Sequence, residues 1–88
     1  HDRVLTFQID ELWMKFIFHK GFVALDGASL TVSSVNRAEN CFSVSLIPET
    51  LARTTLGLLE VGGLVNVEVE AQTVSIVETV ERVMAERE

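Results

Sequence analysis

The residues best suited to hold a polar ligand are two hydroxyls, Ser29 and Thr31, within the stretch of residues 22–32. Alternate residues of a strand share a face, so both hydroxyls point the same way, about 6.5 to 7 Å apart. Each offers one donor and two acceptor lone pairs, and together they could grip a flat polar ring or a polyol. The alternative is an ordinary solvated face, since Ser and Thr are common on the outer side of a sheet.

These hydroxyls follow a predicted turn. Asp26 and Gly27 separate two apolar strand segments, and this pair favours a tight hairpin or corner, because glycine supplies the positive φ that such a turn needs. After the turn, alternation places Ala28, Leu30 and Val32 on the face opposite the hydroxyls. We therefore expect one strand to carry an apolar core face and a polar outer face.

The N-terminal segment predicts a strand and then a short helix. Residues 4–9 alternate between apolar and polar side chains, as a half-buried strand does. The apolar side of this strand consists of Leu5, Phe7 and Ile9. Asp10 can cap a helix over residues 11–16, because its carboxylate can accept free N–H groups of the first turn. The expected buried stripe of this helix is Leu12, Phe16 and, as a further candidate, Trp13.

A return strand and a second short helix are predicted after the central strand. Residues 41–47 alternate again, with Ser and apolar side chains on opposite faces. Pro48 suits the first position of a helix that continues over residues 49–53, because its missing N–H costs nothing there. A glycine turn at residues 61–63 then leads into a strand over residues 64–69.

The last segment changes to helical periodicity. Val77, Val80 and Met84 recur at the spacing of one helix face, and Glu78 with Arg82 forms a favourable pair four residues apart. A Val-rich helix of roughly 15 residues is marginal by itself. We expect its apolar stripe either to cover the chain's own barrel or to meet equivalent helices in an oligomer.

Composition narrows the class of protein. The chain has 88 residues, of which 48% are hydrophobic, so one small domain with a packed core is expected. The net charge of -6 argues against nucleic acid or an anionic membrane as the partner. The single cysteine, Cys41, predicts a reducing, cytoplasmic setting without a disulfide or a zinc site. Because the chain opens on His1 with no initiator Met, we expect it to be a piece of a longer protein.

The order of these elements indicates the fold class. Five or so short strands with helices at the corners predict an all-β fold, a small antiparallel Greek-key barrel followed by a C-terminal α-helix. The sequence contains no motif for a Ser, His and Asp triad, a P-loop, a dinucleotide fingerprint or a metal cluster. The residue pattern by itself therefore predicts a small β-barrel with a polar strand edge.

Three stretches, taken in order, resemble the second lumazine-binding repeat of the riboflavin synthase family. They are residues 20–32 (KGFVALDGASLTV), 46–57 (LIPETLARTTLG) and 65–69 (VNVEV). Residues 72–83 (QTVSIVETVERV) are similar to that family's C-terminal helix. The resemblance implies a six-stranded barrel over residues 1–70, with its opening strand missing, and an oligomerisation helix over residues 71–88.

The same resemblance implies an activity. Enzymes of this family move a four-carbon unit between two molecules of 6,7-dimethyl-8-ribityllumazine, giving riboflavin and 5-amino-6-ribitylamino-uracil without a cofactor or a metal. Each subunit carries two barrels, and three subunits assemble through their C-terminal helices. The active site lies between the first barrel of one subunit and the second barrel of its neighbour, and each barrel holds one lumazine.

Matching the family's motifs residue by residue predicts which residues hold the lumazine. The predicted substrate-binding residues are Lys20, Ser29, Leu30, Thr31, Ile47, Pro48, Glu49, Thr50, Leu51 and Ala52. Among them, Lys20, Ser29 and Thr31 are candidates for stabilising the charge that develops when the C7 methyl group of one lumazine loses a proton. The sequence does not assign the group that takes this proton.

Two departures from the family bear on function. The family usually has Asp where this chain has Glu70, so a carboxylate role there would shift by one methylene. The first barrel and the opening strand of the second are absent from these residues, so we expect the isolated chain to be inactive. A non-catalytic lumazine or flavin carrier is the alternative function, and a barrel with a purely structural role is a third hypothesis. The intact runs at residues 29–31 and 47–50 favour the enzyme.

Overall fold

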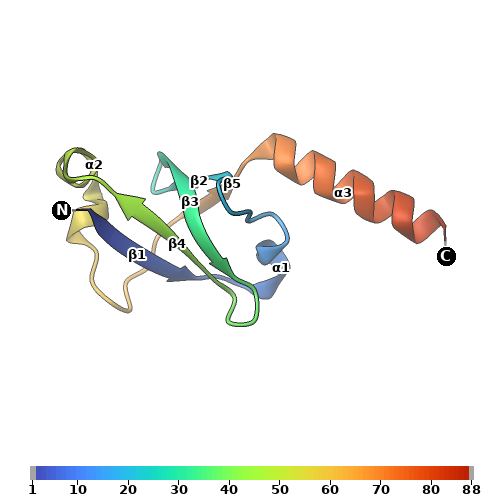
Figure 1. Cartoon of the computed structure of the whole chain (residues 1–88), viewed down its shortest axis with the longest axis horizontal. Helices are drawn as coiled ribbons and strands as arrows, with labels where there is room; N and C mark the ends of the chain where they lie inside the picture. The colour runs from blue at the N-terminus through green and yellow to red at the C-terminus, as the bar shows by residue number, and fades with distance from the viewer. Residues whose placement is uncertain (1, 88) are drawn as a thin grey trace.

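The computed structural model describes residues 2–87, and its strands form one antiparallel sheet (Figure 1). The strand order is β1-β4-β3-β2-β5. The strands are β1 (Arg3–Gln8), β2 (Phe22–Leu25), β3 (Ala28–Asn36), β4 (Cys41–Leu46) and β5 (Val67–Val69). The helical elements are α1 (Glu11–Met14), α2 (Pro48–Arg53), the 3-10 helix η1 (Thr55–Leu58) and α3 (Ala71–Glu86).

The sheet has Greek-key topology. β2, β3 and β4 follow one another as hairpins, whereas β1 lies beside β4 at the far edge rather than beside β2. Every pair of neighbouring strands is antiparallel. The predicted all-β fold with corner helices and a C-terminal helix is therefore confirmed, and residues 2–87 supply five of the six strands that the resemblance implies.

The turn between β2 and β3 consists of Asp26 and Gly27, with Leu25 opposite Ala28. Both turn residues have positive φ, 48° and 84°, the type I′ geometry that matches the twist of the flanking strands. The Asp26 N–H donates to Asn66 O at 2.9 Å, and the Asn66 N–H donates to Asp26 Oδ1 at 2.8 Å. The predicted hairpin is thus confirmed, and its turn is also tied to the residue that precedes β5.

Strand β3 has a different partner along each half. Its first half, residues 28–31, pairs with β2, and its second half pairs with β4 from Val32 onward. A register shift between Val32 and Ser34 marks a bulge. Because bulges increase twist and bend a strand, β3 can belong to both parts of the curved sheet.

The hydrophobic core lies on the inner face of this sheet. Its fully buried members are Ile17, Val23, Leu25, Val32, Phe42, Val44, Leu46 and Leu56. Phe7 of β1 stacks on Phe42, with ring centroids 5.6 Å apart. Leu30 is half-buried against this cluster, whereas Ser29 and Thr31 are exposed. The predicted division of the central strand into an apolar and a polar face is therefore confirmed.

Helix α1 is shorter than predicted. The Leu12 N–H donates to Asp10 Oδ1 at 2.9 Å, so the expected N-cap is confirmed. The helix ends at Met14, however, and the predicted burial is wrong for Leu12, which is 71% exposed, and for Trp13, which is 52% exposed. Phe16 is buried, as predicted, and Met14 is buried in place of Leu12. A single helical turn has no continuous stripe, because the chain changes direction before the 3.6-residue period repeats.

The strand predicted over residues 64–69 is also shorter, because β5 covers only Val67–Val69. Gly62, with φ of 89°, makes the turn that precedes this stretch, and Leu64 is exposed. The Asn66 backbone bonds to the hairpin turn at Asp26 rather than to a neighbouring strand. Turn contacts therefore hold the first half of the predicted strand.

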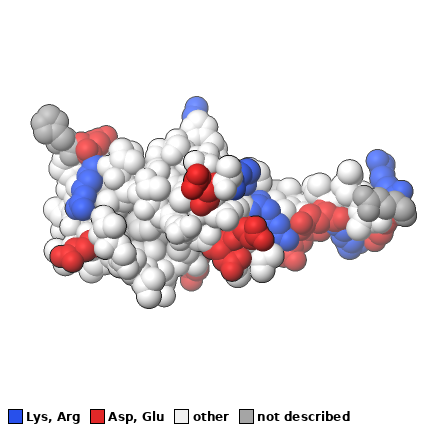
Figure 2. All heavy atoms as spheres, turned by 90° about the horizontal axis from the view of Figure 1, so that it is seen from below, with Lys and Arg blue, Asp and Glu red and all other residues white. Residues whose placement is uncertain are grey.

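Helix α3 projects away from the sheet, and no residue of it is buried (Figure 1). Acidic and basic side chains are interspersed along it (Figure 2). The predicted pair of Glu78 with Arg82 is replaced by one between Arg82 Nη1 and Glu86 Oε1 at 3.7 Å. Lys15 Nζ, which lies 3.0 Å from Glu81 Oε1, connects the end of α1 to the helix. Within residues 2–87, no helix has both the length and the apolar character needed to cross a membrane.

Candidate functional site

The two hydroxyls singled out in the sequence lie on the outer side of the sheet. Residues directly opposite each other in an antiparallel pair point to the same side, so Thr31 shares its face with Phe22, and Ser29 shares it with Ala24. Glu68 of β5 joins them, because it lies opposite Ala24. We call these five residues the hydroxyl face. Phe22 is 59% exposed, so the face combines two hydroxyls with an accessible aromatic ring.

The hydroxyls of Ser29 and Thr31 are not used by the fold. Within residues 2–87, neither makes a hydrogen bond to another group of the chain, unlike the neighbouring hydroxyls. Ser33 Oγ donates to Ser43 O at 3.0 Å, and Thr6 Oγ1 lies 2.8 Å from Ser43 Oγ. The two outer hydroxyls are therefore available to a ligand.

Lys20 lies beside the hydroxyl face, in the loop that enters β2. Its backbone N–H donates to Val32 O at 2.8 Å, and the Val32 N–H donates to Gly21 O at 2.9 Å. These bonds hold the Lys20 backbone next to the residue that follows Thr31. The structure thus brings three predicted site residues, Lys20, Ser29 and Thr31, to one hairpin.

The backbone of Lys20 is strained. The Gly21 N–H donates to Phe18 O at 2.9 Å, which closes a turn with Lys20 at its third position and a φ of 67°. A positive φ confined to this position is type II geometry, which favours glycine or asparagine. A side chain in this conformation costs on the order of 1 to 3 kcal/mol. Glycine would serve this turn better, so Lys20 is an exception to the local backbone preference.

Helix α2 supplies the second group of predicted site residues. Ile47 is its N-cap without a side-chain hydrogen bond, and Pro48 takes the first helical position, as predicted. The first bond of the helix runs from the Leu51 N–H to Ile47 O at 3.1 Å. The N–H groups of Glu49 and Thr50 therefore have no acceptor within the helix.

The side chains of α2 are partly engaged elsewhere. The Glu49 carboxylate pairs with Arg53 Nη2 at 3.0 Å on the exposed side of the helix. Leu51 packs against the core, and Ala52 is exposed. A ligand beside this run would thus meet mainly backbone groups and the Thr50 side chain, which is half-buried.

The hydroxyl face and the start of α2 lie at the same end of the sheet. β3 and β4 are antiparallel, so the residues that begin β3 and those that follow β4 are at one end, as Figure 1 shows for α2 and the β2–β3 turn. Pairing between β3 and β4 ends at Val32 opposite Val44, whereas β4 stays beside β1 until Leu46 opposite Arg3. Leu30 faces the core between these groups, so only its backbone can contribute to the outer face.

Glu70 is the N-cap residue of α3. Its side chain makes no bond to a backbone N–H of the helix, but its Oε2 accepts a hydrogen bond from Thr73 Oγ1 at 2.8 Å. Asp is a better N-cap than Glu, because its shorter side chain reaches the first-turn amides. In this structure the Glu70 carboxylate therefore contacts the Thr73 side chain but does not cap the first-turn N–H groups.

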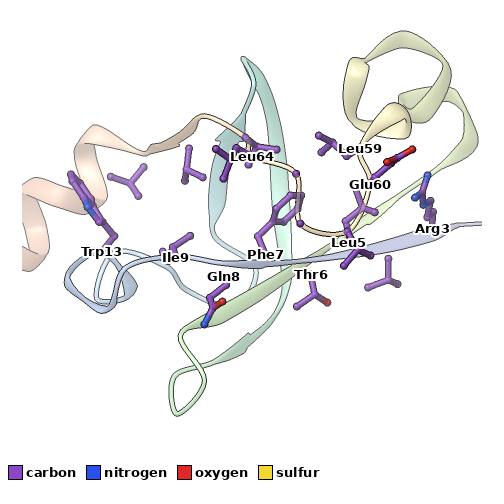
Figure 3. A pocket seen from close by; sticks show the side chains of 17 residues that line it. Arg3, Leu5, Thr6, Phe7, Gln8, Ile9, Trp13, Leu59, Glu60 and Leu64 are labelled. Carbon is purple, nitrogen blue, oxygen red and sulfur yellow. The ribbon is translucent and has the colours of Figure 1, made fainter.

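A groove lies on the other side of the sheet from the hydroxyl face. It has a volume of about 800 Å³ and lies between β1 and residues 59–69 (Figure 3). Apolar side chains of both walls line it, namely Leu5, Phe7, Ile9, Val65, Val67 and Val69. None of the predicted substrate-binding residues lines this groove. The alternation of residues 4–9 predicts which side chains of this strand face inward. It does not predict that the strand lies at the edge of the sheet, beside a groove.

No metal site is evident. Within residues 2–87, no group of three or more His, Cys, Asp or Glu side chains lies close enough together to hold an ion. The chemistry that the described side chains can offer at the hydroxyl face is hydrogen bonding from Ser29 and Thr31, contact with the Phe22 ring, and the charges of Glu68 and of nearby Lys20.

A curved Greek-key sheet with free hydroxyls on the outer face of its central strand defines a small all-β domain with the features of a ligand-binding module. Comparison with known proteins makes the family specific, because residues 1–70 match the lumazine binding domain. The chain belongs to the lumazine-binding domain family.

The relatives confirm the predicted resemblance to riboflavin synthase. The chain is 49% identical to the riboflavin synthase of Escherichia coli over 89 aligned positions, which cover 100% of the chain and 41% of that relative. It is 51% identical to the riboflavin synthase of Chlamydia pneumoniae over 71 positions, 81% of the chain and 34% of the relative. The riboflavin synthase of the yeast Meyerozyma guilliermondii is 39% identical over 66 positions, 74% of the chain and 28% of the relative. The chain therefore spans well under half of the length of these relatives.

The strain at Lys20 leads to a stability prediction. Lys20→Gly should raise the free energy of unfolding by about 1 kcal/mol, because glycine adopts positive φ without a steric penalty, and part of that gain is offset by greater freedom of the unfolded chain. Lys20→Ala removes the same amine but keeps the strained β-carbon, so it should give no such gain. Urea denaturation of both variants measures the difference, and equal stabilities would contradict the assignment of strain.

Proposed function

We propose that this chain is the C-terminal lumazine-binding barrel, residues 1–70, and the oligomerisation helix, residues 71–88, of a riboflavin synthase. The whole enzyme is a transferase of riboflavin biosynthesis. It converts two molecules of 6,7-dimethyl-8-ribityllumazine into riboflavin and 5-amino-6-ribitylamino-uracil. The observation that carries the proposal is the pair of free hydroxyls of Ser29 and Thr31, within a family match over residues 1–70.

The lumazine of this barrel binds at the end of the sheet that carries the hydroxyl face. Ser29 and Thr31 hydrogen-bond the polar ring edge or the ribityl chain, and the free N–H groups of Glu49 and Thr50 bind carbonyl oxygens of the ligand. Phe22 offers its ring to the apolar part of the ligand. The free hydroxyls, the open first turn of α2 and the exposed phenyl ring support this assignment.

Chemistry requires two lumazines in contact. The C7 methyl group of one loses a proton, the resulting anion spreads over its ring, and the second lumazine is attacked at its own C7. Holding two flat rings face to face supplies much of the rate, because it removes the entropy cost of bringing them together. Lys20, Ser29 and Thr31 stabilise the developing charge at this barrel.

We propose that the groove between β1 and β5 receives the opening strand of the barrel, from residues that precede this chain in the whole protein. β1 and β5 are the end strands of the sheet, so each keeps one unpaired edge. The six apolar residues of the groove are only half-buried, and an alternating strand between the two edges would complete their burial. The additional length of the relatives supports this assignment.

We propose that α3 assembles three subunits. The helix buries no residue, and its apolar side chains Ile76, Val80, Val83 and Met84 are exposed. Equivalent helices around a threefold axis would cover this stripe. We further infer a reducing, cytoplasmic location from the free thiol of Cys41, and neither nucleic acid nor a membrane as partner from the net charge of -6.

Thr31→Val tests the ligand face in the full-length protein. It keeps the size and strand preference of the side chain but removes the hydroxyl, so a fluorescence titration with the lumazine should show binding roughly threefold to tenfold weaker. Leu30→Val is the matched control on the core face, and it should cost about 1 kcal/mol of stability with little direct effect on binding. Parent-like binding by Thr31→Val, with weakened binding by a stable Leu30→Val, would reverse the assignment of the two faces.

The isolated 88-residue chain should not form riboflavin at a useful rate. One barrel presents one lumazine, so the rate that is gained by holding two lumazines together is lost. Riboflavin fluorescence after incubation with the lumazine measures turnover, with the full-length protein as the control. Turnover by the isolated chain equal to that of the full-length protein would sink the two-barrel proposal. Binding without turnover by the full-length protein would instead identify a carrier.

Deletion of the full-length protein from Gln72 onward should lower its oligomeric state, because the exposed stripe of α3 then has no counterpart. Val80→Glu should act in the same direction by placing a charge in the stripe, whereas Ser75→Glu, on another side of the helix, should leave assembly intact. Sedimentation velocity measures all three variants. An unchanged oligomer after the deletion would remove this role from α3.

A further inference from the structure

One arginine connects two segments that lie far apart in the sequence. Arg37 belongs to the connection between β3 and β4, and its Nη1 and Nη2 donate to Met14 O and Ile17 O, each at 2.7 Å. The guanidinium carbon also lies 5.5 Å from the centroid of the Phe18 ring. The planar fork of arginine can serve two carbonyls and an aromatic face at once, which a lysine cannot do.

The segment that Arg37 holds is the loop that carries Lys20. Ile17 is buried in the core at one end of this loop, and the Lys20 N–H is bonded to Val32 O at the other. Phe18, which the guanidinium covers, is the first residue of the turn in which Lys20 has positive φ. A strained backbone persists only where its surroundings over-determine it. Arg37 supplies three contacts to this segment, namely the hydrogen bonds to Met14 O and Ile17 O and the contact with the Phe18 ring.

We propose that Arg37 is a positioning residue for Lys20, and that it fixes the loop so that the lysine reaches the ligand on the hydroxyl face. Arg37 itself does not touch the ligand in this arrangement. The inference rests on the proposed function, in which Lys20 contacts the lumazine. It goes beyond that function, because Arg37 lies outside the residues to which the motifs assign binding and comes from the opposite end of β3 from Ser29.

A double-mutant cycle in the full-length protein tests the coupling. Lys20→Ala and Arg37→Ala should each weaken lumazine binding by about fivefold or more. The Kd of the double variant should be within twofold of that of the weaker-binding single variant, because both changes remove the same interaction of Lys20 with the ligand. Kd from fluorescence titration and kcat/KM from riboflavin formation are measured for each. Glu39→Ala, in the same connection, is the control and should behave like the parent.

Folding is monitored separately, because Arg37→Ala leaves two carbonyls without their donor. Arg37→Lys keeps the charge and most of the aliphatic chain but loses the forked guanidinium, so it should fold. Its loss of lumazine affinity, measured as log Kd, should be at least half of that of Arg37→Ala. Thermal melts establish that each variant is folded at the titration temperature.

Three results would overturn the inference. If folded Arg37 variants lower the melting temperature but bind and turn over like the parent, Arg37 is only structural. If the Arg37→Ala and Lys20→Ala losses multiply in the double variant, Arg37 acts independently of Lys20. If Lys20→Ala itself binds and turns over like the parent, the assignment of Lys20 in the proposed function is wrong, and the positioning role falls with it. The first two results leave the proposed function intact.

Discussion

The register of β3 is the constraint on which the rest of the structure depends. Leu30 and Val32 must face the core, so Ser29 and Thr31 are forced outward. A slip of one residue would exchange the two faces, and the two-residue turn at Asp26 and Gly27 excludes such a slip by fixing Leu25 opposite Ala28. The position of the hydroxyl face thus follows from the packing of the core and from the geometry of one turn.

Lys20 differs in residue type from the other residues that have positive φ. Within residues 2–87, five residues have positive φ, and four of them are Gly, Asp or Asn, which tolerate this region: Asp26, Gly27, Asn40 and Gly62. Lys20 is the exception. Lys20 thus breaks a local backbone preference close to the free hydroxyls, and Arg37 bonds to the segment that leads to it. This exception supports the proposed role of the Lys20 side chain.

Features encoded by neighbouring residues could be predicted from the sequence, whereas those created by tertiary contacts could not. The hairpin at Gly27, the faces of β3 and the helix start at Pro48 follow from local backbone chemistry. The burial of Met14 in place of Leu12 depends on where α1 stops and on what lies beneath it. The bonds from Arg37 to Met14 and Ile17 span 23 and 20 residues, and no periodicity signals them. The motifs predict the candidate site residues, which stay a prediction, and they do not predict the positive φ of Lys20.

The uncovered apolar surfaces of the described residues are those expected of a domain that packs against other protein segments. Unpaired edges of β1 and β5 border an apolar groove, and the apolar side of α3 is exposed. Such surfaces are costly in water and promote aggregation unless another segment covers them. The hydroxyl face, by contrast, carries two free hydroxyls and the Glu68 carboxylate beside the exposed Phe22 ring. None of the residues that line the groove belongs to the hydroxyl face, so in the proposed function another segment can cover the groove while that face stays open to a ligand.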